Sequence, residues 1–401
     1  MNVFLFSIFK YLEIIILGLS NLILAETLGP AQLGQLMPVI IFITYSNYTV
    51  FGAPQLILKY WSRKKSPKTQ ASLMSASVKL LVFGSVGTWL LALIVIESSY
   101  ILKVTLVSIL TFFASYLSAK LRVEYRLLPV NLAHVLTSFT LLLLIYLFVT
   151  DIESYLVSLL VAKAVMLLIY VYFDFSFFIS SLKQLFKKLH LKLFMAYLIS
   201  AVLMTLNGLI ISLILVMDRL VIQSWRVSEE ILGVYQLADT ISMFGYLLLT
   251  TVFFYFYPFI LQKVRESKAF RSKYLCIVIL LSCSPLFVYW PLNWVTGSLE
   301  GRLFSTFQGV WSVALAVSLL KISIFSYSVL MTFFVAISSR SKIIGWSLTT
   351  FIVLTCIGII FNKDLSSSYF WLPITFCFAI STLTASVAYF EFRKESFIYR
   401  L

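Results

Sequence analysis

The feature that most constrains this chain is a long series of apolar blocks whose connections alternate in charge. The connection at 59–68 carries five Lys and Arg residues, the next informative one carries Asp151 and Glu153, and the segment 183–192 carries four lysines. During membrane insertion Lys and Arg stay on the cytoplasmic side, whereas Asp and Glu have little influence. The alternation therefore predicts a polytopic membrane protein with both termini in the cytoplasm.

Composition supports this interpretation. The chain is 61% hydrophobic and only 12% charged, against about 25% charged residues in soluble domains. A helix needs roughly 20 apolar residues to cross about 30 Å of hydrocarbon, so we expect an all-α integral membrane protein with about 12 transmembrane helices. The expected spans are 3–24, 36–58, 76–96, 100–118, 132–150, 155–178, 193–217, 236–260, 274–290, 308–335, 343–361 and 369–390.

The sequence contains a weak internal repeat, with one copy in each half of the chain. Residues 29–36 and 228–235 each enter a long apolar block through a Leu-Gly pair, and Gly34 and Gly233 lie about half a chain length apart. Two six-span units of the same orientation would form parallel halves around a central cavity near the bilayer midplane. We therefore expect an N-terminal half at 1–178, a basic cytoplasmic linker at 179–192 and a C-terminal half at 193–401; an accidental repeat is the alternative.

The residues at these entries resemble a known family. Residues 28–34 read Leu-Gly-Pro-Ala-Gln-Leu-Gly, which is similar to the signature after the first span of polysaccharide-type (Wzx-like) flippases of the multidrug/oligosaccharidyl-lipid/polysaccharide exporter superfamily. The second half shows the family's D-R pair at Asp218-Arg219, then Gly233-Val234-Tyr235 and Ala238-Asp239, with Pro258 further on. Glu26-Thr27 stands where family members often carry Arg, so that cationic contact cannot be transferred.

The resemblance implies a transporter, not an enzyme. It would flip an undecaprenyl-pyrophosphate-linked oligosaccharide from the cytoplasmic to the outer face of a bacterial inner membrane by alternating access, for O-antigen or capsule assembly. Its partners would be this lipid-linked oligosaccharide, membrane lipids, and a polysaccharide polymerase with its chain-length regulator. A multidrug antiporter driven by a cation gradient and a membrane glycan polymerase or ligase are the alternatives. The polymerase would need a larger outer loop than any expected here.

Charges inside expected spans are the candidate site residues, because a charge at a helix centre costs about 2.5–3.5 kcal/mol. Lys163 and Lys321 are predicted to bind the pyrophosphate headgroup, since lysines suit phosphate groups. The alternative is a structural ion pair, Lys163 with Asp174 or Lys321 with Asp239. Arg219 is a third candidate headgroup contact, with interfacial anchoring as its alternative.

Four further polar residues are predicted to line the cavity or couple transport to an ion, and they are Glu13, Asn207, Asp174 and Asp239. Glu13 could carry a proton, or it could pair with Lys10 three residues earlier on the same helix face. No G-x-x-x-x-G-K-[ST] sequence occurs, so a P-loop ATPase is excluded. The four cysteines show no metal-ligand spacing, and we expect no metal, cofactor or nucleic acid.

Overall fold

A computed structural model describes residues 3–61, 66–188, 191–337, 339–363 and 369–397. Arg63, Lys64 and Lys65 of the first basic connection lie outside these ranges. Every secondary-structure element in the described part is a helix, and no strand occurs there, which confirms the all-α fold class. In order the helices are α1 (Val3–Ser46), α2 (Ala53–Tyr60), α3 (Pro67–Val95), α4 (Ile101–Val123), α5 (Leu127–Phe148), α6 (Ile152–Phe173), α7 (Phe175–Leu185), α8 (Leu191–Ser224), α9 (Glu229–Glu266), α10 (Lys268–Leu299), α11 (Val310–Ala336), α12 (Arg340–Ile360), η1 (Phe361–Lys363) and α13 (Trp371–Phe397).

Ten helices of the described part are long and apolar enough to cross a membrane. Helix α1 contains the first expected span and part of the second, because the chain stays helical between them except at Gly29. Gly29 has φ 70° and ψ 176°, a left-handed combination that glycine adopts without a steric penalty. Helix α8 covers the whole of the expected seventh span, 193–217.

The expected second span, 36–58, is not one helix. Helix α1 ends at Ser46, and α2 begins at Ala53 after a turn in which Phe51 and Gly52 both have positive φ. A Cβ at Gly52 would lie 2.4 Å from Thr205 Oγ1 and 2.9 Å from the Ala201 carbonyl oxygen. Close packing against α8 therefore requires glycine at this turn, and the span is broken there.

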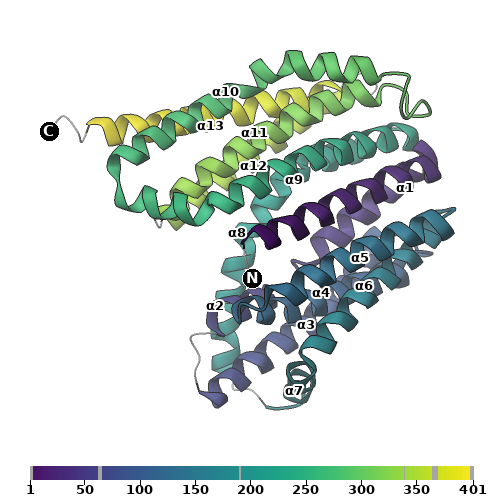
Figure 1. Cartoon of the computed structure of the whole chain (residues 1–401), viewed down its shortest axis with the longest axis vertical. Helices are drawn as coiled ribbons and strands as arrows, with labels where there is room; N and C mark the ends of the chain where they lie inside the picture. The colour runs from purple at the N-terminus through teal and green to yellow at the C-terminus, as the bar shows by residue number, and fades with distance from the viewer. Residues whose placement is uncertain (1–2, 62–65, 189–190, 338, 364–368, 398–401) are drawn as a thin grey trace. The chain divides into compact units, whose positions relative to one another are not determined.

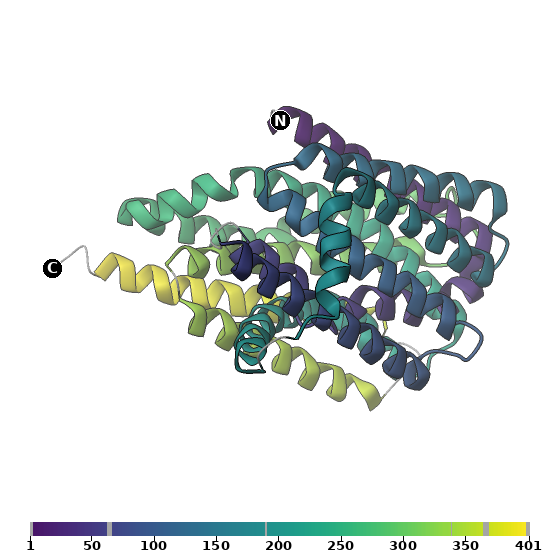
Figure 2. The ribbon, with the colours of Figure 1, turned by 90° about the horizontal axis from the view of Figure 1, so that it is seen from below.

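The expected sixth span, 155–178, also divides. Helix α6 ends at Phe173, and α7 follows Asp174 as a separate helix of 11 residues. Figure 2 shows α7 crossing the long helices of its unit at a steep angle. Most of the expected linker segment 179–192 is thus helical, not an extended connection.

The connections on the predicted outer side are shorter than expected. Helix α9 begins at Glu229, where Ser228 accepts a hydrogen bond from the backbone N–H of Ile231 and so caps the helix. Helix α10 continues to Leu299, through Pro285 and Pro291. Much of the expected loop 291–307 is therefore helix.

The chain forms two compact units. The first contains residues 1–28 and 35–209, and the second contains residues 29–34 and 210–401. The expected halves 1–178 and 193–401 describe topology across the membrane, and they stay a prediction. Within the first unit α4 packs against α2, α3 and α6, and within the second unit α11 packs against α9, α10 and α13 (Figure 1). Most side chains of α11 are buried.

Residues 29–34 belong to the second unit because two glycines bring backbones together there. A Cβ on Gly34 would lie 1.8 Å from the carbonyl oxygen of Glu229, and a Cβ on Gly233 would lie 1.8 Å from that of Pro30. The glycine of each repeat copy thus packs against the backbone of the other copy. No other residue type leaves room for a carbonyl oxygen at this distance.

Candidate functional site

In the second unit, a buried carboxylate on α9 pairs with two cations. Asp239 Oδ1 lies 2.8 Å from Lys321 Nζ on α11, and Asp239 Oδ2 lies 3.1 Å from Arg219 Nη1 on α8. The Lys321 ammonium also donates to the carbonyl oxygen of Leu215 at 2.9 Å. The alternative that the sequence offered for Lys321, a pair with Asp239, is the arrangement observed.

A second carboxylate completes this group. Tyr235 donates its hydroxyl to Asp218 Oδ2 at 2.7 Å. Asp218, Arg219, Tyr235, Asp239 and Lys321 are all buried, with exposed fractions of 7% or less. The charges of two carboxylates and two cations cancel, so this buried group is formally neutral. We call these five residues the paired cluster.

The first unit places a smaller charged group around Glu13 of α1. Glu13 Oε2 lies 2.9 Å from Lys10 Nζ, the pairing that the sequence offered as one alternative. Glu13 Oε1 lies 3.3 Å from Nδ1 of His134 on α5, a contact that the sequence analysis did not anticipate. The Glu13 side chain is only 14% exposed, and groups from two helices, α1 and α5, contact its carboxylate.

Lys163 of α6 differs from Lys321 in having no partner of its own. Within the described part of the chain its ammonium makes no ion pair or hydrogen bond, although Glu13 is near enough to act on it electrostatically. The residue is half-buried in the middle of an apolar helix. A cation held there without a partner is available to an anionic ligand.

The predicted alternative pair of Lys163 with Asp174 is wrong. Asp174 follows the last residue of α6, about 16 Å along the axis from Lys163 at 1.5 Å per residue. Its carboxylate instead pairs with Lys120 of α4, which also lies 2.9 Å from Glu124 and over the ring of Phe177. Asp174 is buried and fixes the junction of α6 and α7 to α4.

The first unit also contains a polar pocket of about 230 Å³, lined by the turn that follows α1 and by α2, α4, α5 and α6; Lys163 is not among its lining residues. Its polar lining includes Asn47, Gln55, Arg122, His134 and Tyr170. Tyr170 is 1% exposed and its hydroxyl has no hydrogen-bond partner among the described residues. Seven residues separate Lys163 from Tyr170, which places both on one face of α6.

Arg122 is the residue of this pocket that sequence reasoning missed as a candidate. It follows the end of the expected span 100–118 in the sequence, whereas in the structure it lies in the last turn of α4 and borders the pocket. Helical continuation of the apolar block beyond residue 118 was the signal that could have revealed it. Asn207 lies on α8, but its side chain is outside the described part of the structure.

The described residues contain no group of three or more His, Cys, Asp or Glu side chains that could hold a metal ion. The described geometry offers a multi-span helical scaffold with a neutral buried cluster in the second unit and, in the first unit, a polar pocket bordered by Arg122 and a half-buried Lys163 without an ion pair. Such an arrangement can bind a polar or anionic group inside a membrane-spanning bundle. The class defined by fold and site is that of a polytopic helical membrane protein with an internal polar site.

Comparison with solved structures makes the fold more specific. The lipid II flippase MurJ in an inward closed conformation is similar over 97% of this chain and 87% of its own, with a TM-score of 0.69 and 13% identity. An inward-facing multidrug resistance MATE family transporter of the MOP superfamily matches over 95% of both chains, with a TM-score of 0.67 and 14% identity. A MOP superfamily transporter from Pyrococcus furiosus matches over 97% of this chain and 95% of its own, with a TM-score of 0.52 and 14% identity.

No protein-family model matches the sequence, and no curated protein matches it either. At these identities the structural similarity establishes the fold alone. The chain therefore has the fold of MOP superfamily transporters, a fold shared by flippases and multidrug transporters.

Proposed function

We propose that this protein is a flippase that moves a polyprenyl-pyrophosphate-linked oligosaccharide, of the undecaprenyl type, across a bacterial cytoplasmic membrane for surface polysaccharide assembly. The observation that carries the proposal is the unpartnered ammonium of Lys163 within an apolar helix of a transporter fold. A pyrophosphate is an anion that cannot cross hydrocarbon without compensating charges. Lys163 supplies such a charge without a competing carboxylate of its own.

The pocket lined by Tyr170, which shares a face of α6 with Lys163, supports an anionic headgroup. Arg122 borders it with a guanidinium for which the described residues provide no ion pair, and the unpartnered Tyr170 hydroxyl can donate to a phosphate oxygen. We assign the first headgroup contact to Lys163, with Arg122 and Tyr170 as additional contacts. Lys321 and Arg219 remain predicted headgroup contacts, but we assign them a lesser role because both already form ion pairs with Asp239.

The lipid II flippase in the comparison supports a lipid-linked substrate, and the multidrug transporters support the alternative of an antiporter. An antiporter for cationic drugs needs an available carboxylate. Glu13 and Asp239 are each paired with cations in this structure, which favours the flippase. The proposed ion-coupling roles of Glu13, Asp174 and Asp239 require their pairs to open during transport.

The experiment is depletion of the protein in its native cell, followed by extraction of lipid-linked oligosaccharides. We expect complete, unpolymerised units to accumulate on the cytoplasmic face and surface glycan to be lost. Re-expression of wild type should restore export, and Lys163→Met should not, although its membrane level should match wild type. Single units that reach the outer face without polymerising would instead identify a polymerase. Unchanged glycan with altered drug sensitivity would identify the antiporter.

A further inference from the structure

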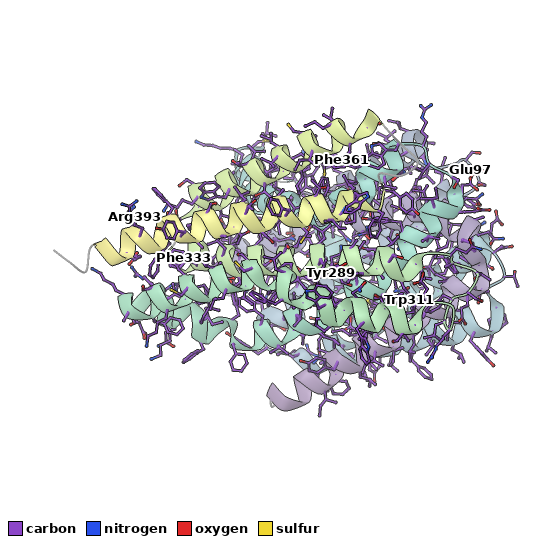
Figure 3. All side chains as sticks on the ribbon, turned by 90° about the horizontal axis from the view of Figure 1, so that it is seen from above. Glu97, Tyr289, Trp311, Phe333, Phe361 and Arg393 are labelled. Atoms are coloured by element: carbon purple, nitrogen blue, oxygen red, sulfur yellow. The ribbon has the colours of Figure 1, made fainter. Side chains whose placement is uncertain are left out.

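A second, chemically different cavity lies entirely in the second unit. It is a groove of about 670 Å³ between α10, α11 and α13, in the size range of small-molecule sites. Tyr289 and Trp311, which border it, are marked in Figure 3 on α10 and α11. Several lining side chains are strongly exposed, including Leu286 (71%), Trp290 (73%) and Phe378 (68%). In a membrane-spanning unit such side chains face the hydrocarbon of the bilayer, so the groove is accessible from lipid.

The groove is apolar along its depth and polar at one end. On α10 the lining runs from Ser282 through Leu286 and Trp290 to Asn293, Thr296 and Glu300. Trp311 also lines the groove and donates its indole N–H to the carbonyl oxygen of Leu303, three residues after Glu300, so it lies at the same polar end; tryptophan is enriched at membrane interfaces. The polar end is therefore a mouth at the membrane surface, which the topology predicted from the loops places on the outer side.

The dimensions match one leaflet. From Ser282 to Asn293 the helix rises about 16 Å, close to half of the roughly 30 Å hydrocarbon core. The remaining stretch to Glu300 rises about 10 Å, which is enough to reach through the headgroup region. A helix with its side chains is about 10–12 Å wide, too bulky for a groove of this volume over that length. One lipid with its chain in the groove and its headgroup at the mouth fits.

The hydroxyl groups deep in the groove are satisfied by the protein itself. Ser282 and Ser326 hydrogen-bond at 2.8 Å, and Ser323 lies 2.9 Å from Ser381 and 3.0 Å from Cys377. Trp311 donates its indole N–H to the carbonyl of Leu303. The deep walls consequently offer an occupant van der Waals contact with few free polar groups, as an aliphatic chain requires.

Charge at the mouth selects the headgroup. Glu300 is the one charged residue among those that line the groove in the described part of the chain, and neither Lys nor Arg lines it. A carboxylate there attracts an ammonium group and repels an uncompensated phosphate. This is the opposite of the first unit's pocket, where Arg122 and His134 face the cavity.

We propose that this groove is a binding site for one amine-bearing zwitterionic phospholipid, with an acyl chain along α10, α11 and α13 and its ammonium beside Glu300. The site is separate from the headgroup pocket that Tyr170 lines and does not depend on the transported substrate. A polyprenyl phosphate, whose head lacks a cation, is disfavoured here.

The test uses the purified full-length chain reconstituted in nanodiscs with equal amounts of phosphatidylethanolamine and phosphatidylglycerol, then analysed by native mass spectrometry. We expect wild type to retain one phosphatidylethanolamine in preference to phosphatidylglycerol. Glu300→Gln should reduce that preference about two- to five-fold, the range of an exposed ion pair. Glu97→Gln, which removes a carboxylate outside the groove, should leave the preference unchanged.

A volume change tests the groove itself. An added Cβ at Gly297, which lines the groove, meets no heavy atom within 4 Å, and the same holds at Gly345 of α12, outside the groove. Gly297→Phe should abolish retention of the lipid, and Gly345→Phe should not. Retention that survives Gly297→Phe, or equal retention of the two phospholipids by wild type, would overturn the proposal.

Two further measurements keep the test decisive if a variant fails to fold. Cys283 lines the groove, while Cys276 and Cys356 are exposed, so a membrane-soluble maleimide reports on all three in wild type. Labelling of Cys283 should slow several-fold in phosphatidylethanolamine relative to phosphatidylglycerol vesicles, with the other two cysteines unchanged; equal slowing of all three would refute specific binding. Displacement of the retained lipid by added polyprenyl phosphate would assign the groove to the transported lipid instead.

Discussion

Lys163 of the first unit and Lys321 of the second unit have similar sequence surroundings, since each is a lone lysine within a long apolar block. In the structure they have different environments. Lys321 is 2% exposed and is bound by Asp239 and the Leu215 carbonyl. Lys163 is half-buried and has no hydrogen bond or ion pair within the described residues. An intramembrane lysine can therefore stabilise packing or remain available to a ligand, depending on the neighbouring helices.

The largest expected effect comes from opening the paired cluster. Asp239→Ala would leave Lys321 and Arg219 as buried cations without their carboxylate, which costs about 3–5 kcal/mol. We expect a large fall in the thermal unfolding midpoint of the purified protein in detergent. Lys321→Met should cost less, because Asp239 keeps Arg219. Similar unfolding midpoints for Asp239→Ala and wild type would contradict the view that Lys321, unlike Lys163, stabilises the packing.

The next effect is on transport and concerns Lys163. Lys163→Met removes a charged contact to the headgroup, and such contacts contribute about 1.5–3 kcal/mol, or roughly 10- to 100-fold in transport rate. The unfolding midpoint should stay near that of wild type, since no ion pair is lost. Lys163→Arg should retain most transport. Equal rates for the Met and Arg variants would show that charge at this position is not used.

Glu13→Gln should have an intermediate effect on stability. The change weakens contacts with Lys10 and His134, but both partners are partly exposed and can gain other interactions. We expect a loss of about 1 kcal/mol, toward the upper end for exposed ion pairs. Thermal unfolding under the same conditions as for Asp239→Ala provides the measurement. A loss as large as that of Asp239→Ala would mean that the first unit is also held by its charges.

The smallest effect is expected at Asp151, an exposed carboxylate that serves as a reference for both clusters. Its pKa is lowered chiefly because the backbone N–H of Ser154 donates to the carboxylate, as part of a capping box at the start of α6. A lowered pKa in the folded state adds stability above the unfolded pKa, and this stability disappears as pH falls through the folded pKa. Asp151→Ala should therefore lower the unfolding midpoint slightly at pH 7 and by less at pH 3. An unchanged difference would show that the charge of Asp151 does not contribute.

Much of the fold followed from the sequence because apolar length and loop charge are local properties. The helices α3, α4 and α5 lie where the sequence placed spans, and the few residues at 97–99 do separate α3 from α4. Breaks at Gly52 and Asp174 could not be placed, because each depends on a neighbouring helix: α8 packs on the first, and Lys120 of α4 binds the second.

The candidate site was only partly predictable for the same reason. Helical periodicity places Lys163 and Tyr170 on one face of α6, but it cannot show that Arg122 of α4 borders the pocket that Tyr170 lines. The pairing of Lys321 with Asp239 was one of two alternatives, since sequence spacing does not reveal which side chains of different helices meet. The contact between Glu13 and His134 joins residues more than a hundred positions apart, so it required the tertiary structure.

The contact at Gly34 and Gly233 has a consequence for how the chain matures. Ribosomes release residues 29–34 long before the start of α9 with which they pack. The second unit therefore stays incomplete until a segment made much earlier is available to it, and such distant pairing is slow to form. A fragment that begins at residue 210 would lack this segment, and the surface of α9 at Gly233 would lose the backbone that packs against it. We therefore expect the second unit to complete its packing only with residues 29–34 from the N-terminal region of the same chain.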